Sequence, residues 1–158
     1  MKNLIRENAR KSIIGNVVVN TVIPFALLLS DPLVNLKGAT PNLLSVLVPG
    51  VFMSALMTTI ITFGVMAAQR KAGLLAPALP ADTRWFPKAL AEGIGIGLLF
   101  AVPALLIILG LQATQDNAEI PKLTVIGISA AVGALTGLLS SLVASKRAAK
   151  LGGLVAAV

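Results

Sequence analysis

The chain has no cysteine, histidine or tyrosine, and these absences exclude several kinds of chemistry. It can form no disulfide, no thiolate or imidazole metal site, no His-ligated haem and no nucleophilic site that pairs Ser or Cys with His. Only six residues are acidic, and most of them lie in predicted loops, so neither a carboxylate metal cage nor a two-carboxylate acid–base pair is expected. We therefore expect no enzyme, no metal and no cofactor.

Apolar residues, by contrast, dominate the chain. Of its 158 residues, 56% are hydrophobic and only 12% are charged. The apolar residues form four long runs, at residues 12–30, 43–68, 89–111 and 123–145. Each run is near or above the roughly 20 residues that a helix needs to cross a bilayer. The sequence predicts an all-α integral membrane protein with four transmembrane helices, because the helices of a soluble bundle would each carry a polar face.

The basic residues are unevenly placed along the predicted topology. Eleven of the thirteen precede the first run, lie between the second and third runs, or follow the fourth; Lys37 and Lys122 are the two exceptions. By the positive-inside rule, both termini and the central loop are expected on the cytoplasmic side. The surplus of positive charge therefore indicates topology and contact with membrane lipids. No nucleic acid partner is expected, since no basic patch is interleaved with aromatic residues.

The two halves of the chain resemble each other when the sequence is shifted by 79 residues. The shift superimposes Pro24 on Pro103, Lys71 on Lys150 and Gly73 on Gly152. Each half crosses the membrane twice, so the halves are predicted to be two helical hairpins that form parallel repeats about an axis along the membrane normal. The predicted division is a first hairpin with a basic N-terminus at residues 1–75, a cytoplasmic interfacial connector at 76–88, and a second hairpin with a basic tail at 89–158.

Small residues recur at every fourth position of the second and fourth runs. The stripe Gly50, Ser54, Thr58 and Thr62 falls on the stripe Ser129, Gly133, Gly137 and Ser141 under the same shift, and the third run adds Gly93 and Gly97. Stripes of this kind are typical of close helix packing in membranes. The alternative is that the hydroxyl groups line a pore.

The first run contains two asparagines, Asn16 and Asn20, which share one helix face with the adjacent Thr21. An unpaired amide in hydrocarbon costs several kcal/mol, so this face is expected to look inward. The asparagines either bond to a neighbouring helix or line a polar path. The run follows a basic stretch as the core of a signal peptide does, but its length and its asparagines favour a retained span.

Glu92 is the only acidic residue predicted inside a span, about one turn from the cytoplasmic end of the third run. One interpretation is a carboxylate that is stabilised by the helix N-terminus and by Lys88, four residues earlier. The other is proton or cation coupling, in which Glu92 joins Asn16, Asn20 and Thr21 in a polar path.

Two further features concern shape and anchoring. Pro24 and Pro103 occupy matching positions in the first and third runs, where each is expected to kink its helix or to act as a hinge. Trp85 and Phe86 precede the third run and are predicted to form an interfacial anchor, with a docking loop for a partner as the alternative.

These features resemble a loose group of small bacterial inner-membrane proteins that have four spans and no assigned activity. The resemblance rests on the repeated asparagines Asn16 and Asn20 before a Pro-containing outer loop, and on the basic stretch from Arg84 to Lys88 that leads into the third run. It implies the bacterial inner membrane as the location and a multi-pass topology. It supplies no catalytic residue.

The sequence as a whole favours a non-enzymatic membrane protein, either self-associating or bound to other membrane subunits as a structural or accessory component. The alternative is a small channel or transporter, formed by a homo-oligomer, for an ion or a small solute. A single bundle this rich in Leu and Val has little room for a pore, which favours the first interpretation.

Overall fold

The computed structural model describes residues 2–30, 32–38, 41–115 and 118–150. These residues form the helices α1 (Lys2–Leu27), α2 (Leu43–Lys71), α3 (Phe86–Thr114) and α4 (Lys122–Ala149). Two short strands, β1 (Leu33–Asn35) and β2 (Glu119–Pro121), lie in the α1–α2 and α3–α4 connections. The prediction of an all-α protein is confirmed, and the strands are an addition to it.

Three of the described helices are long and apolar enough to cross a membrane. They are α2, α3 and α4, with mean hydropathies of 2.0, 2.7 and 1.9 in their most apolar windows. The apolar part of α1 is shorter, because the helix ends at Leu27 and its first ten residues carry the charges of Lys2, Arg6, Glu7, Arg10 and Lys11. A membrane-spanning role for α1 therefore stays a prediction.

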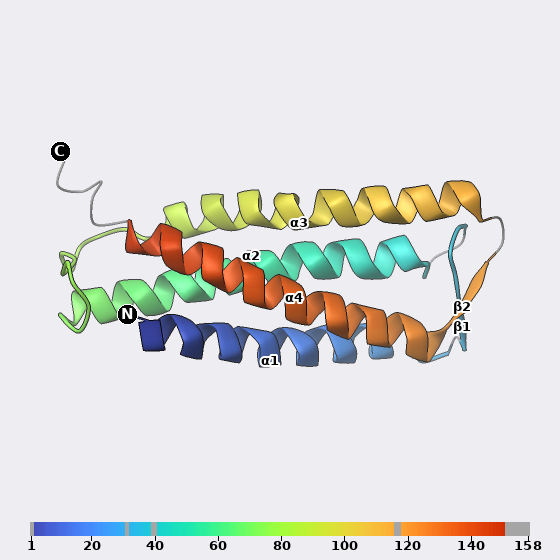
Figure 1. Cartoon of the computed structure of the whole chain (residues 1–158), viewed down its shortest axis with the longest axis horizontal. Coiled ribbons are helices and arrows are strands. Elements are labelled where there is room, and N and C mark those ends of the chain that lie inside the picture. The colour runs from blue at the N-terminus through green and yellow to red at the C-terminus, as the bar shows by residue number, and fades with distance from the viewer. Residues whose placement is uncertain (1, 31, 39–40, 116–117, 151–158) are drawn as a thin grey trace.

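Each helix packs mainly on a helix from the other half of the chain (Figure 1). Helix α1 lies along α4, α3 lies along α2, and α2 and α4 also pack on each other. The consecutive pairs α1–α2 and α3–α4 touch only slightly. The helices of each predicted hairpin are thus joined in sequence but are not each other's principal packing partners.

The two ends of the bundle differ in character (Figure 1). At one end, which we call the basic end, lie the start of α1, the α2–α3 connector and the last turn of α4. At the other, which we call the ribbon end, the two strands pair antiparallel, with Val34 opposite Ile120. The basic residues that the sequence analysis assigned to the cytoplasmic side belong to segments at the basic end.

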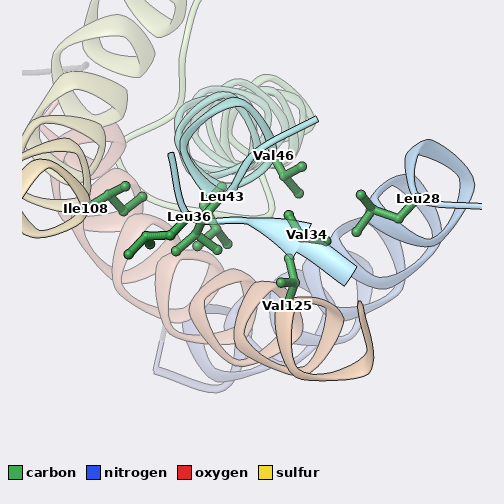
Figure 2. Close-up of a cluster of buried hydrophobic side chains, with 8 residues drawn as sticks. Leu28, Val34, Leu36, Leu43, Val46, Ile108 and Val125 are labelled. Atoms are coloured by element: carbon green, nitrogen blue, oxygen red, sulfur yellow. The ribbon is translucent and has the colours of Figure 1, made fainter. Parts of the chain in front are cut away.

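The ribbon end is closed by a cluster of buried apolar side chains (Figure 2). The cluster consists of Leu28, Val34, Leu36, Leu43, Val46, Leu47, Ile108 and Val125. Hydrogen bonds join the α1–α2 connection to the neighbouring ends of α3 and α4: Gln112 Nε2 of α3 donates to the carbonyl of Leu36 at 2.6 Å, and the Lys122 amide at the start of α4 donates to the carbonyl of Pro32 at 3.0 Å. The β1–β2 ribbon therefore links the two halves of the chain, and the burial of these apolar side chains stabilises this end of the bundle.

The basic end is fastened by Arg70, whose side chain is only 1% exposed. Its Nε donates to the carbonyl of Pro77 at 2.8 Å, and its Nη1 donates to the carbonyl of Ala148 at 3.2 Å. Arg70 thus joins the end of α2 to the connector and to the last turn of α4. A cation at this position also interacts favourably with the negative ends of both helix dipoles.

The aromatic pair at the start of α3 divides into a packed and an exposed member. Trp85 is half-buried against α2, where a Cβ added to Gly64 would lie 3.0 Å from the indole ring. Phe86 is 51% exposed, and its ring meets that of Trp85 edge to face at 5.9 Å. The interfacial anchor stays a prediction, with Phe86 as the side chain free to enter the interface.

Candidate functional site

A long groove separates α1 from α2, because both helices pack on α4 rather than on each other. It has a volume of about 720 Å³. Its lining residues run from Leu4 to Leu27 on α1 and from Ser45 to Gln69 on α2. At 1.5 Å per residue, the lined part of α2 is about 36 Å long, which exceeds the ~30 Å hydrocarbon thickness of a bilayer.

The floor of this groove is formed by the two asparagines and the hydroxyl groups of α2. Asn16 Nδ2 donates to Thr58 Oγ1 and to the Ser12 carbonyl, both at 2.8 Å. Asn20 Nδ2 donates to Ser54 Oγ at 2.7 Å and to the Asn16 carbonyl at 2.9 Å. Both amide protons of each side chain are therefore used, and two of the bonds join α1 to α2.

The small residues of α2 and α4 form the sockets for these asparagines. A Cβ added to Gly137 would lie 2.5 Å from Asn16 Nδ2, and one added to Gly133 would lie 2.6 Å from Asn20 Nδ2. On α2, a Cβ added to Gly50 would lie 3.0 Å from Asn20 Oδ1. The stripes of α2 and α4 thus face the same side chains of α1, and their small size makes room for the amides.

Other residues of the stripes are buried in the helix contacts. Thr62, Ser129 and Ser141 are buried in α2 and α4. On α3, Gly93 faces Leu56 and Gly97 faces Phe52, each so closely that an added Cβ would lie 2.8 Å from the neighbouring side chain. These glycines permit the close approach of α3 to α2.

We expect the asparagine–hydroxyl pairs to be energetically coupled, and a double-mutant cycle on Asn20 and Ser54 measures this coupling. Asn20→Ala and Ser54→Ala should each destabilise the folded protein, and their effects should be non-additive by roughly 0.6–2 kcal/mol, the usual value of an interhelical hydrogen bond in a membrane. Unfolding in mixed micelles gives the free energies. Additive effects would mean that the 2.7 Å bond contributes nothing.

The line of polar residues on α1 extends beyond the predicted pair. Asn8, Ser12, Asn16 and Asn20 follow one another at intervals of four, and we call them the polar seam. Asn8 is 9% exposed, and its Nδ2 has no hydrogen-bond partner among the described residues. The sequence analysis missed Asn8 because it lies among basic residues before the apolar run, although its spacing from Ser12 was a usable signal.

Helix α4 continues the seam with buried hydroxyl groups. Gly133 faces Asn20 and Gly137 faces Asn16, so four residues along α4 correspond to four residues back along α1. The same spacing brings Ser141 level with Ser12 and Ser145 level with Asn8. The Oγ atoms of Ser141 and Ser145 are buried and have no hydrogen-bond partner within the described part of the chain. The polar character therefore reaches from the middle of the bundle to the basic end.

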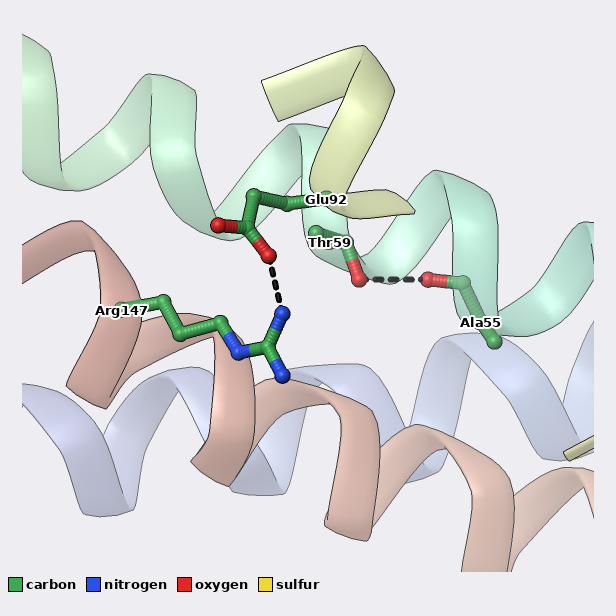
Figure 3. Close-up of polar contacts among 4 residues, drawn as sticks. All are labelled: Ala55, Thr59, Glu92 and Arg147. Atoms are coloured by element: carbon green, nitrogen blue, oxygen red, sulfur yellow. Dashed lines mark hydrogen bonds and ion pairs between the residues drawn. The ribbon is translucent and has the colours of Figure 1, made fainter. Parts of the chain in front are cut away.

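Thr21 and Glu92 lie apart from this seam. The Thr21 hydroxyl donates to the carbonyl of Val17 in its own helix at 2.7 Å. The Glu92 carboxylate pairs with Arg147, between α3 and α4 (Figure 3). Figure 3 also shows the buried Thr59 hydroxyl, which donates to the Ala55 carbonyl at 2.8 Å. The four residues of the predicted polar path are thus not brought together.

Glu92→Gln is expected to change stability little. The side chains of Glu92 and Arg147 are 24% and 48% exposed, and ion pairs in contact with solvent contribute about 0–1 kcal/mol. Thermal unfolding in detergent measures the effect, with Lys88→Gln, one turn earlier on α3, as a control. A loss above about 2 kcal/mol would instead assign the pair a structural role comparable to that of a buried ion pair.

The prolines and the opening of the groove complete the site. Pro24 lies in α1 and lines the groove together with Pro49 of α2, while Pro103 lies in α3.

Glu7 and Lys11, which also line the groove, form an exposed ion pair at 2.6 Å. The hydrogen bond from Lys11, and then its charge, lower the pKa of the Glu7 carboxyl below its ordinary value. The pair keeps the opening at the basic end polar.

The described residues include no group of three or more Asp or Glu side chains that could hold a metal ion. No family model, curated protein sequence or solved structure matches this chain. The case for a function therefore rests on the groove, the polar seam and the way the helices pack.

Proposed function

We propose that this protein is a non-enzymatic accessory subunit of a membrane assembly, with the α1–α2 groove as the surface that receives another subunit. The groove is the observation that carries the proposal. It extends along two whole helices, whereas the glycines of the stripes are already in contact with side chains of the chain itself. Self-association through the same groove is the other form of this function.

The topology that we propose has four transmembrane helices, with both termini on the cytoplasmic side of a bacterial inner membrane. The apolar part of α1, from Ser12 onward, runs beside the membrane-compatible α4, and this packing favours a fourth span. The clustering of basic segments at one end of the bundle supports the orientation.

The packing pattern also supports the proposed repeat. Exchange of the two halves turns the α1–α4 contact into the α3–α2 contact and leaves the α2–α4 contact unchanged, as a two-fold axis along the bundle requires. Helix α2 begins at Leu43 and α4 begins at Lys122, at positions separated by the same shift of 79 residues that relates the two halves of the sequence. The repeat is therefore best described as two interlocked hairpins.

Native mass spectrometry of the protein in nanodiscs tests the proposed function. A foreign membrane subunit in fixed stoichiometry is the expected result, and Met57→Trp, which fills the groove, should release it. Ile107→Trp is the matched control, since both side chains are exposed and apolar but only Met57 lines the groove. A bare monomer, or a homo-oligomer that is insensitive to Met57→Trp, would contradict the accessory role.

A small oligomeric channel or transporter for an ion or small solute is the second candidate, and the polar seam is the observation that favours it. The seam reaches from the basic end to Asn20, but the apolar cluster closes the ribbon end. Solute flux in liposomes that falls when Asn8 is replaced by leucine would support this candidate. If flux keeps its pH dependence after Glu92→Gln, Glu92 plays no part in coupling.

A further inference from the structure

We infer that the occupant of the α1–α2 groove is a transmembrane helix of a different protein, one that carries a hydrogen-bond-donating side chain, Ser, Thr, Asn or Gln, at its mid-span. This inference rests on the proposed accessory function and names the chemistry of the partner. It is carried by the length of the groove, by the polar atoms at its middle, and by the composition of the chain's own outer faces.

The length of the groove matches a helix better than a lipid. Its lining extends from Ser45 to Gln69 on the membrane-compatible α2, about 36 Å, which is enough to cross the full hydrocarbon thickness. The acyl chains of a phospholipid occupy only one leaflet, half of that thickness. A transmembrane helix is the common membrane component that extends continuously through both leaflets.

The chemistry at the middle of the groove calls for a donor. Asn16 bonds Thr58, which lies near the midpoint of the lined part of α2. Within the described part of the chain, the side-chain hydrogen bonds of Asn16 and Asn20 run through Nδ2, so that the two Oδ1 oxygens are left to accept bonds. A lipid tail has no donor at the bilayer centre, and the backbone N–H groups of a helix are used within the helix. A polar side chain of the incoming helix is therefore the group that satisfies these oxygens.

The walls of the groove allow a close approach at this depth. Gly15 lines the groove, and a Cβ added there would meet nothing within 4 Å. Opposite it, α2 contributes Met53 and Met57, which are 49% and 48% exposed. Methionine side chains adapt to the shape of an incoming surface. The groove thus offers a small residue on one wall and flexible apolar side chains on the other.

A second copy of the chain does not fit this chemistry. The exposed side chains in the middle of α3 are apolar, among them Leu98, Leu99 and Val102, and those in the middle of α4 include Leu135 and Leu139. The polar seam of α1 and the hydroxyl stripe of α2 face each other inside the chain. The half-buried Thr21 hydroxyl of α1 already donates to the Val17 carbonyl. The described residues therefore present no unused outward donor at mid-span, and the donor must come from another protein.

Two synthetic transmembrane peptides test the inference. Both have a Leu-Ala host sequence with lysines at the ends, and they differ only in a central Asn or Leu. Their affinity for the protein in liposomes is read by energy transfer from a dye on Leu74→Cys, which lies at the basic end and is 73% exposed, in a chain that has no natural cysteine. We expect the Asn peptide to bind at least about tenfold more tightly, the equivalent of about 1.4 kcal/mol.

Groove variants assign this preference to the site. Met57→Trp should abolish the preference for the Asn peptide, and Ile107→Trp should preserve it. Equal affinities for the two peptides would overturn the inference, as would equal losses in the two variants. Evidence for another occupant of the groove would also overturn the inference. One lipid per chain that is retained in native mass spectrometry and lost with Met57→Trp would identify a lipid. Energy transfer between two copies that is lost with the same variant would identify a second copy of the chain.

The peptide assay and the native mass spectrometry can fail separately. If a stoichiometric foreign subunit is released by Met57→Trp but the peptides bind equally, the accessory function stands and the mid-span donor is wrong. If the Asn peptide is preferred but only bare monomer is found in the native spectrum, the groove recognises a donor helix and the accessory function is contradicted.

Discussion

Gly137→Ala is expected to destabilise the folded protein by about 3 kcal/mol. The added Cβ would lie 2.5 Å from Asn16 Nδ2 and 2.8 Å from the Ser12 carbonyl oxygen, so that α1 must move away from α4. Overpacking of this kind costs about 1–3 kcal/mol, and the displaced Asn16 would also lose interhelical hydrogen bonds worth about 1 kcal/mol each. Gly137→Leu should prevent the native packing altogether.

Gly127→Ala is the matched control for this change. Gly127 lies on the same helix, α4, and a Cβ added there would meet nothing within 4 Å. The substitution should be neutral or stabilising by up to about 1 kcal/mol, because alanine is the better helix former. Unfolding in mixed micelles compares the two variants. Similar stabilities of Gly137→Ala and Gly127→Ala would show that the asparagine socket is not as close-packed as described.

Arg70→Met should cost about 3 kcal/mol, the second large effect. The substitution keeps most of the apolar stem but removes the guanidinium hydrogen bonds to the carbonyls of Pro77 and Ala148. A buried polar group without its partner costs about 1–3 kcal/mol. Arg70→Lys should recover only part of the loss, since a single ammonium group cannot reproduce the fork that reaches both carbonyls.

Lys71→Met distinguishes the loss of the Arg70 hydrogen bonds from a general effect of lost positive charge. Lys71 carries the same charge on the next residue, and its exposed Nζ donates to the Ala81 carbonyl at 2.6 Å. Its replacement should lower stability by less than about 1 kcal/mol. Hydrogen exchange gives a local measurement: Arg70→Met should speed exchange in the last turn of α4, and Lys71→Met should not. Equal exchange rates in both variants would show that the Arg70 hydrogen bonds do not stabilise the last turn of α4.

Hydropathy was sufficient to predict four helices, yet each helix differs in its bounds from the apolar run that predicted it. The run at 12–30 corresponds to α1 (Lys2–Leu27), which begins ten residues earlier. Charged residues such as Arg6 and Arg10 end an apolar run, but they do not interrupt a helix. The β1–β2 ribbon was not predicted, since strands of three residues have too few side chains to show an alternating pattern.

Most residues of the candidate site could be predicted from the sequence, but which of them contact one another could not. Spacing placed Asn16 and Asn20 on one face and the small residues on another. It did not reveal that the glycines of α4 are the sockets for those asparagines, because this contact depends on which helices become neighbours. Composition likewise assigned Arg70 to the general excess of basic residues at the cytoplasmic side, although it is 1% exposed and bonds three main-chain carbonyls.

The contact between α1 and α4 joins a helix to one that the ribosome makes only after α2 and α3. Until residues 122–149 have been synthesised and inserted, Asn16 and Asn20 lack the space that Gly137 and Gly133 provide, and α1 lacks its principal packing partner. The native packing of α1 is therefore completed only after α4 has been made, and before that point the asparagines can bond only the hydroxyl groups of α2 and the main chain of α1.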